Sequence, residues 1–255
     1  MNIILTILFL LVGGIAAGLF ATVASIASLA SYPVLLAVGI PPVYANVTND
    51  AALIWTGISS TISATKELKG HWKEVFFYSI FTIIGSIGGC ILLLIYPPKV
   101  FEKLVPWFVL FSGIMVIVSG RYKIEPTNDK TPKWLMIIYI IAMLIMGAYT
   151  GYFGAAGGVL ILVLLSYLSK ARNNFAVIKA EENVVSGFAN LVALIIFAFT
   201  SKIYWLQSIP LAIGMFIGGY LGPKIVRKVP EKPIRIFIAI LAFVQAAYFF
   251  WEAYL

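Results

Sequence analysis

Apolar runs alternate with short polar or glycine- and proline-rich interruptions along the whole chain. Ten apolar segments can be separated in this way, and a helix that crosses a bilayer needs about 20 mostly apolar residues. Their approximate limits are 3–20, 26–40, 46–64, 74–96, 102–119, 134–152, 157–169, 181–200, 204–222 and 234–254. The pattern predicts an all-α polytopic membrane protein.

The second and seventh segments are short, and each follows its predecessor after only a few small residues, at 21–25 and 154–156. Inside a bilayer, a break in the backbone is tolerated only where protein or a water-filled cavity satisfies the freed groups. Each pair of segments can therefore be a re-entrant hairpin or two full crossings. The first run has no Lys or Arg before it, so we expect a retained helix rather than a cleaved signal peptide.

The composition excludes a water-soluble globule. Of the 255 residues, 62% are apolar and only 11% are charged, whereas soluble domains have about 25% charged residues. We therefore expect one transmembrane domain over 1–255. The net charge of +8 comes from residues between apolar runs, so the expected partner is the lipid bilayer and not nucleic acid. The single cysteine, Cys90, excludes an intrachain disulfide.

The two halves of the chain match at a shift of 133 positions, and farther on 85–89 pairs with 214–219. Two repeats, 1–120 and 134–255, joined by a cytoplasmic linker at 121–133, explain this match. Five segments per repeat is an odd number, so the second repeat is expected to be inverted in the membrane. The pairs that carry the match are Gly14/Gly147, Gly18/Gly151, Phe20/Phe153 and Trp72/Trp205.

Positive residues support this segment count, because Lys and Arg concentrate in cytoplasmic loops. With ten segments, 15 of the 18 Lys and Arg residues fall on one side of the membrane. Counting 3–40 and 134–169 as single spans removes the bias. We therefore predict a multi-pass protein of the cell membrane with both termini outside the cytoplasm.

Two glycine-rich turns are candidate binding elements. The stretch 147–158 ends on Gly157 and Gly158, which open a short helix. A helix start carries about half a positive charge and can bind a small anion. In the first repeat, Ala24 and Ser25 stand where the second has these paired glycines. Glycines spaced by four residues, as at 14, 18, 147 and 151, also allow close helix packing, which is the alternative role for those four.

Polar residues at the starts of the third and eighth segments are the second candidate. At the same shift, Asn49 aligns with Glu182 and Asp50 with Asn183, so each repeat has one carboxylate and one amide. A carboxylate at the membrane centre costs about 2.5 kcal/mol or more, which favours a functional role. Alternatively, Asp50, Glu181 and Glu182 cap helix N-termini at the interface.

Asn190 lies about two helical turns after Asn183, so it is expected to line the same cavity or to hold two helices together. No nucleotide loop, catalytic triad or His/Cys cluster is present in the sequence, so we expect neither an enzyme nor a cofactor or metal. The candidate substrate-binding residues are Ser25, Asn49, Asp50, Gly157, Gly158, Lys179, Glu182, Asn183 and Asn190.

The paired glycine-rich first segments, the short second segments, the polar-headed third segments and the closing stretch 218–237 resemble the TauE/SafE sulfite exporter family of membrane transporters. The resemblance covers essentially the whole chain and is strongest at 147–158 and 218–237. The first repeat departs from it at Ala24 and Ser25. The resemblance implies export of sulfite, sulfonates such as sulfoacetate, or other small organic anions.

Such export is physically reasonable by alternating access. Opposed helix breaks would place partial positive charges near the midplane, and Lys179 would add a full one. A monoanion moving outward gains about 2.3 kcal/mol per 100 mV. Ionised Asp50 and Glu182 would repel the anion, so at least one is expected to be protonated or paired with Lys179 when the substrate is bound.

Two other functions fit the same sequence. One is a proton- or cation-coupled carrier of another small solute, in which Asp50 and Glu182 bind the coupling ion. The other is a non-transporting membrane subunit whose small-residue motifs serve assembly alone. The sequence also allows a homo-oligomer.

Overall fold

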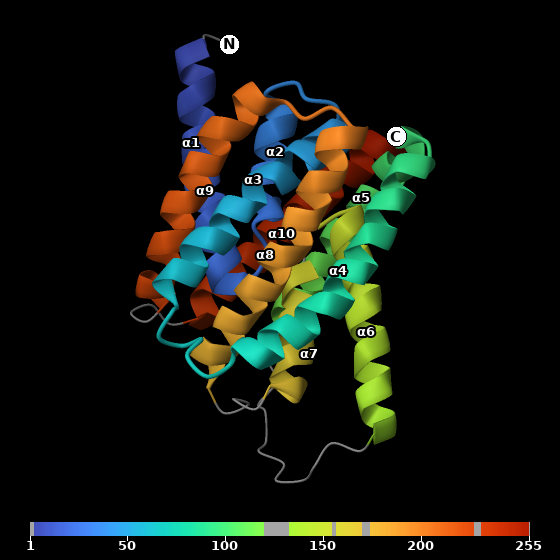
Figure 1. Ribbon diagram of the computed structural model, residues 1–255. Helices are drawn as coiled ribbons and strands as arrows, with labels where there is room; N and C mark the ends of the chain where they lie inside the picture. Colours follow the sequence, from blue (N-terminus) through green and yellow to red (C-terminus); the bar gives the residue numbers. More distant parts are fainter. Residues whose placement is uncertain (1–2, 120–132, 155–156, 170–173, 227–230, 255) are drawn as a thin grey trace.

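The computed structural model describes residues 3–119, 133–154, 157–169, 174–226 and 231–254, and within them every regular element is a helix (Figure 1). The all-α prediction is therefore confirmed. The linker predicted at 121–133 lies outside the described residues except for Lys133, where α6 begins. The helices are α1 Ile3–Ala24, α2 Ser28–Ala37, α3 Pro42–Ser63, α4 Trp72–Ile95, α5 Pro98–Ser119, α6 Lys133–Tyr152, α7 Gly157–Leu168, α8 Phe175–Thr200, α9 Trp205–Val226 and α10 Glu231–Tyr254.

The two helices with predicted polar starts begin earlier than predicted, α3 at residue 42 instead of 46 and α8 at 175 instead of 181. Pro42 suits the first turn of α3, where a missing N–H has no consequence. The Asn174 side chain caps α8 by accepting a hydrogen bond from the Val177 N–H at 3.4 Å. The capping alternative is therefore wrong for the acidic residues at 50, 181 and 182, because neither helix has an acidic residue in its first turn.

The outer surface is apolar and the interior contains charge, as expected for a protein surrounded by lipid. Phe199 is 87% exposed, whereas Asp50 and Glu182 are 1% and 2% exposed. Five helices in the described residues are long and apolar enough to cross a membrane. They are Ile3–Ala24, Trp72–Ile95, Trp134–Tyr152, Phe175–Thr200 and Trp205–Gly222. The chain is a polytopic membrane protein.

Helices α2 and α7 are too short to cross alone. At 1.5 Å per residue they are about 15 and 18 Å long, against a hydrocarbon core of about 30 Å. Helix α2 follows α1 after a break at Ser25, and α7 follows α6 after a break at Gly154. Both residues have positive φ, of 60° and 73°, and this conformation reverses the chain. These lengths favour the hairpin alternative for both pairs.

The two most closely packed helix pairs each join a helix of the first half of the chain to a helix of the second half. The most extensive contacts join α1 to α9 and α4 to α6, which are equivalent pairs under the shift of 133. Helix α1 enters from the end where both termini lie, whereas α6 enters from the opposite end (Figure 1). Two inverted repeats would produce this arrangement.

Glycines bring the paired helices into backbone contact. A Cβ added at Gly14 would overlap the Leu211 carbonyl oxygen of α9, and one added at Gly85 would overlap the Leu144 carbonyl oxygen of α6. The same overlap occurs at Gly18, Gly89, Gly147 and Gly151. The packing role considered for the glycines at 14, 18, 147 and 151 is therefore confirmed.

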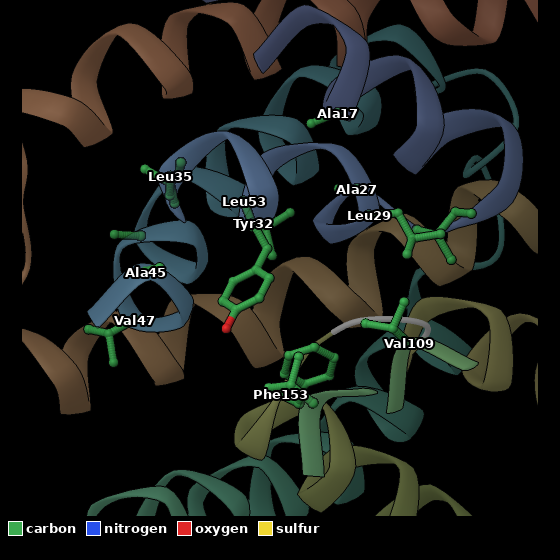
Figure 2. Close-up of a cluster of buried hydrophobic side chains, with 14 of the residues drawn as sticks. Ala17, Ala27, Leu29, Tyr32, Leu35, Ala45, Val47, Leu53, Val109 and Phe153 are labelled. Carbon is green, nitrogen blue, oxygen red and sulfur yellow. The ribbon is translucent and has the colours of Figure 1, made fainter. Parts of the chain in front are cut away.

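An apolar cluster packs the short helix α2 against the break that follows α6. Figure 2 shows Tyr32 of α2 pointing toward Phe153, which lies in the turn after α6. Their ring centroids are 5.8 Å apart in an edge-to-face contact. Phe101 of α5 also packs on Phe153, at 5.6 Å. The turn after α6 is thereby held beside α2, which comes from the other half of the chain.

Two alanine substitutions on α4 test the role of glycine contact. Gly85→Ala should lower the free energy of unfolding by about 1–3 kcal/mol, because the added methyl group meets backbone. Gly88→Ala is the matched control, since nothing lies within 4 Å of its added Cβ, and it should be neutral or stabilising by about 0.5–1 kcal/mol. Thermal unfolding in detergent measures both. Equal effects of the two substitutions would contradict the packing role.

Candidate functional site

The two helix breaks meet at one cavity in the interior. Ser25 and Ser28 reach it from the first break, and Gly154 and Gly158 reach it from the second. The cavity has a volume of about 60 Å³, measured as the space open to the centre of a water molecule. This is room for a few water molecules or one small ion. Segments about 130 residues apart in the sequence thus form one site.

Helices α3 and α8 complete the cavity wall. Five of the nine predicted site residues line it, and Asn190 does so together with Asn183, as their spacing predicted. The five predicted residues that line the cavity are Ser25, Gly158, Glu182, Asn183 and Asn190. Lys179 lies directly behind this wall, hydrogen-bonds to Ser25 and Asn183 and forms an ion pair with Glu182.

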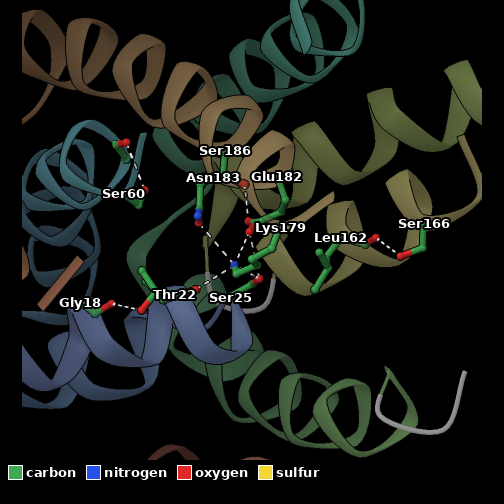
Figure 3. A network of polar contacts seen from close by, with 12 residues as sticks. Gly18, Thr22, Ser25, Ser60, Leu162, Ser166, Lys179, Glu182, Asn183 and Ser186 are labelled. Atoms are coloured by element: carbon green, nitrogen blue, oxygen red, sulfur yellow. Dashed lines mark hydrogen bonds and ion pairs between the residues drawn. The ribbon is translucent and has the colours of Figure 1, made fainter. Parts of the chain in front are cut away.

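The Lys179 ammonium group is surrounded by oxygen atoms (Figure 3). It donates hydrogen bonds to the Ala21 carbonyl oxygen at 2.9 Å and to Ser25 Oγ at 2.5 Å. It also donates to Asn183 Oδ1 at 3.3 Å and forms an ion pair with Glu182. Lys179 is only 7% exposed, so these contacts replace its hydration. A full positive charge is thereby fixed at the first helix break.

The Glu182 carboxylate occupies a position suited to an anion. Its Oε2 accepts hydrogen bonds from Lys179 and from Ser25, the latter at 3.0 Å, and its Oε1 accepts one from Ser186 at 2.9 Å. A Cβ added at Gly158 would lie 2.6 Å from Oε1, which places this oxygen beside the first turn of α7. Helix starts stabilise negative charge. The carboxylate therefore has the surroundings that a bound oxyanion would require.

The equivalent polar residues of α3 lie behind the cavity wall instead of on it. Asn49 donates to Ser28 Oγ at 3.0 Å and accepts from Ser31 Oγ at 2.5 Å. Asp50 faces the second break, since a Cβ added at Gly154 would lie 3.2 Å from its Oδ1. Neither Asn49 nor Asp50 is among the residues that line the inner cavity. The cavity therefore does not support the prediction that these two residues contact the substrate directly.

Gly157 also lies off the cavity wall. A Cβ added there would overlap the Thr150 hydroxyl group, so this glycine allows the start of α7 to pack on α6. Only Gly158 of the glycine pair reaches the cavity.

Four hydroxyl-bearing residues that line the cavity were missed by the sequence analysis: Ser28, Thr56, Thr150 and Ser186. Small hydroxyl residues are common in transmembrane packing, so their type alone is a weak signal. Ser186 follows Glu182 by four residues, and this spacing on one helix face could have identified it. Glu181 points away from the cavity and lies 3.1 Å from His71 Nδ1 in the turn between α3 and α4.

A second, outer cavity of about 330 Å³ lies at the far end of α2, between α2, α5 and α10. Glu102 and Glu252 give it acidic walls. Tyr32 lines this cavity, and Ser28, one turn earlier on α2, lines the inner one. The Tyr32 ring packs on Phe153 and Phe249, each at 5.8 Å, and Tyr32 and Phe249 both line the outer cavity.

The chain is similar to a known family of membrane proteins. The family described as Sulfite exporter TauE/SafE matches residues 10–249. No solved structure gives a significant match.

Three relatives are similar over most of the chain. Probable membrane transporter protein YfcA of Escherichia coli (strain K12) is 24% identical over 93% of this chain and 87% of its own length. A Probable membrane transporter protein of Haemophilus influenzae is 24% identical over 96% and 93%. Probable membrane transporter protein ORF9 of a Sinorhizobium species is 22% identical over 93% and 90%. The chain therefore belongs to the TauE/SafE sulfite exporter family of membrane transporters.

Proposed function

We propose that the protein is a secondary transporter that exports sulfite, organosulfonates such as sulfoacetate, or related small anions by alternating access. The observation that carries this proposal is the buried Lys179 ammonium group, which lies where the two helix breaks meet a polar cavity. The family's description as a sulfite exporter supports the substrate class. The size of the inner cavity supports a small substrate.

The ion pair with Glu182 suggests how an anion enters the site. In the structure, Lys179 forms an ion pair with Glu182. A substrate oxyanion would replace one Glu182 oxygen as the partner of Lys179, Ser25 and the start of α7. The buried ammonium group then keeps a negative partner throughout, and the displaced Glu182 carboxylate takes up a proton, which avoids the cost of an unpaired buried charge.

The placement of the two cavities supports alternating access. In this proposal, the contacts of Tyr32 with Phe153 and Phe249 close the route between the inner and the outer cavity. Opening this aromatic contact, with α2 moving, would connect the site to the end of the molecule where the termini lie. Repeats over 1–120 and 134–255, inverted in the membrane, would provide the equivalent movement of α7 at the other end.

The orientation that fits export places the termini outside the cell. The turn between α3 and α4 carries Lys66 and Lys69 and lies at the end opposite the termini (Figure 1). Positive loops favour the cytoplasm. A negative cell interior then drives anions toward the termini.

A role in assembly alone is less consistent with the structure. Helix assembly is served by small residues at interfaces, and the glycine contacts of α1, α4, α6 and α9 fulfil that need. A role in assembly alone does not explain why Lys179 and Glu182 are buried beside a cavity.

Removal of the ammonium group should abolish transport. In proteoliposomes loaded with sulfite or sulfoacetate, Lys179→Gln should reduce efflux at least tenfold. Lys202→Gln is the matched control, because Lys202 lies over the Tyr204 ring at 4.8 Å and should retain efflux within about twofold of the unaltered protein, as a surface substitution. Lys179→Gln combined with Glu182→Gln removes both buried charges and separates loss of function from loss of folding. A folded double variant with full efflux would contradict the proposal.

Neutralising Glu182 should strengthen anion binding. Glu182→Gln leaves Lys179 without its carboxylate partner, so the free energy of unfolding without ligand should fall by about 3–5 kcal/mol. Added sulfite then has no competitor for the ammonium group, and its dissociation constant should fall about tenfold, or about 1.4 kcal/mol. Thermal unfolding at a series of sulfite concentrations measures both effects. An unchanged or weaker response to sulfite in this variant would exclude the exchange of partners.

A further inference from the structure

Asp50 is a buried carboxylate without a partner. It is 1% exposed, and neither of its oxygens has a hydrogen-bond partner in the described part of the chain. Asn46, one turn earlier on the same face of α3, is also 1% exposed, and its Oδ1 has no partner either. Three buried acceptor oxygens thus lie near one another without donors. A buried charge of this kind is costly unless something compensates it.

The other half of the chain contains the compensating group at the matching position. The shift of 133 aligns Asn46 with Lys179 and Asp50 with Asn183. The Lys179 ammonium group is held by the Ala21 carbonyl oxygen in the last turn of α1 and by Asn183 Oδ1. At the matching position of α3 the ammonium group is missing, because residue 46 is a neutral amide.

Asp50 faces the second helix break, as the Lys179 network faces the first. A Cβ added at Gly154, just after α6, would lie 3.2 Å from Asp50 Oδ1 and 3.6 Å from the Thr150 carbonyl oxygen. The Asn46 side chain donates to the Tyr152 carbonyl oxygen at the end of α6, at 3.3 Å. The last carbonyl groups of a helix carry partial negative charge and attract cations. Carboxylate, amide and carbonyl oxygens therefore gather here.

We propose that Asp50, Asn46 Oδ1 and carbonyl oxygens at the end of α6 bind a monovalent alkali cation, Na⁺, in the place that the Lys179 ammonium group takes in the other half. A proton would satisfy one of the three acceptor oxygens, whereas a hard cation accepts several oxygen ligands at once. One carboxylate is neutralised by one positive charge, which favours a monovalent ion. Broken helices bind coupling cations in this manner in other secondary transporters.

This inference rests on the proposed anion transport and adds a cation whose binding strengthens that of the anion, while the membrane potential remains the force that drives export. Gly154 lines the anion cavity, and Asp50 lies directly behind it. With Na⁺ bound, Asp50 no longer repels an anion in the cavity. Because coupling between two sites is reciprocal, Na⁺ should strengthen sulfite binding, and sulfite should strengthen Na⁺ binding to the same degree.

Binding of radiolabelled Na⁺ to the purified full-length protein tests the site directly. The unaltered protein should bind one Na⁺ saturably, and sulfite should raise this affinity about tenfold. Asp50→Asn should lose Na⁺ binding. Glu67→Gln removes a carboxylate from the turn between α3 and α4 and should bind Na⁺ as the unaltered protein does.

A tethered ammonium group gives a second, independent variant. Asn46→Lys would place an amine beside Asp50, as Lys179 lies beside Asn183. This variant should bind no Na⁺, and its affinity for sulfite should be the same in sodium and in N-methylglucamine chloride. In the unaltered protein, sulfite affinity should fall about tenfold when N-methylglucamine replaces Na⁺.

The outcomes separate this site from the proposed function. Failure of the unaltered protein to bind Na⁺ above the level of Asp50→Asn, while sulfite still binds, would overturn the cation site and leave anion transport standing. Asp50-dependent Na⁺ binding without any sulfite binding would support the cation site and overturn the proposed function. Sulfite affinity that is independent of Na⁺, with a pH dependence that Asp50→Asn removes, would assign a proton to Asp50 and overturn the proposal.

Discussion

A transmembrane helix that stops inside the bilayer leaves backbone carbonyl groups where water cannot reach them, and the whole site depends on how this protein satisfies them. Lys179 of α8 donates to the Ala21 carbonyl oxygen in the last turn of α1. Asn46, at the matching position of α3, donates to the Tyr152 carbonyl oxygen at the end of α6. Each half of the chain thus closes the helix break of the other half, with a side chain at the same place in its third helix.

The two hydrogen bonds from Lys179 and Asn46 to the ends of α1 and α6 cap these helices at their C-termini, and they explain the position of the polar cavity. Glycine contacts pull α1 against α9 and α4 against α6, so the two broken helices are fixed on opposite sides of α3 and α8. The caps differ in charge: one is an ammonium group and the other is a neutral amide. The ammonium group pairs with Glu182 beside the start of α7, which is the proposed anion site. Within the described residues the amide leaves Asp50 without a hydrogen-bond partner, which is the basis of the proposed cation site.

Much of this was available from the sequence, because lipid imposes long apolar runs and because the repeats carry the same small residues. Each predicted segment corresponds to a helix, and the shift of 133 singled out Glu182 and Asn183, which both line the cavity. The early starts of α3 and α8 were missed, since a proline and an asparagine cap extend both helices through residues that read as polar turns. The direction of side chains could not be predicted either: Asn49 turns to the serines of α2, and Asp50 turns behind the cavity wall.

The convergence of both helix breaks on one anion site can be tested by locating the bound anion. Selenite has the shape and charge of sulfite and scatters anomalously at the selenium edge, so crystals soaked with it give the anion's position without ambiguity. A single anomalous peak between Ser25, Gly158 and the Lys179 ammonium group, displaced by added sulfite, is the expected result. A peak confined to the outer cavity at Glu102 and Glu252, or on the lipid-facing surface, would contradict a shared site at the two breaks.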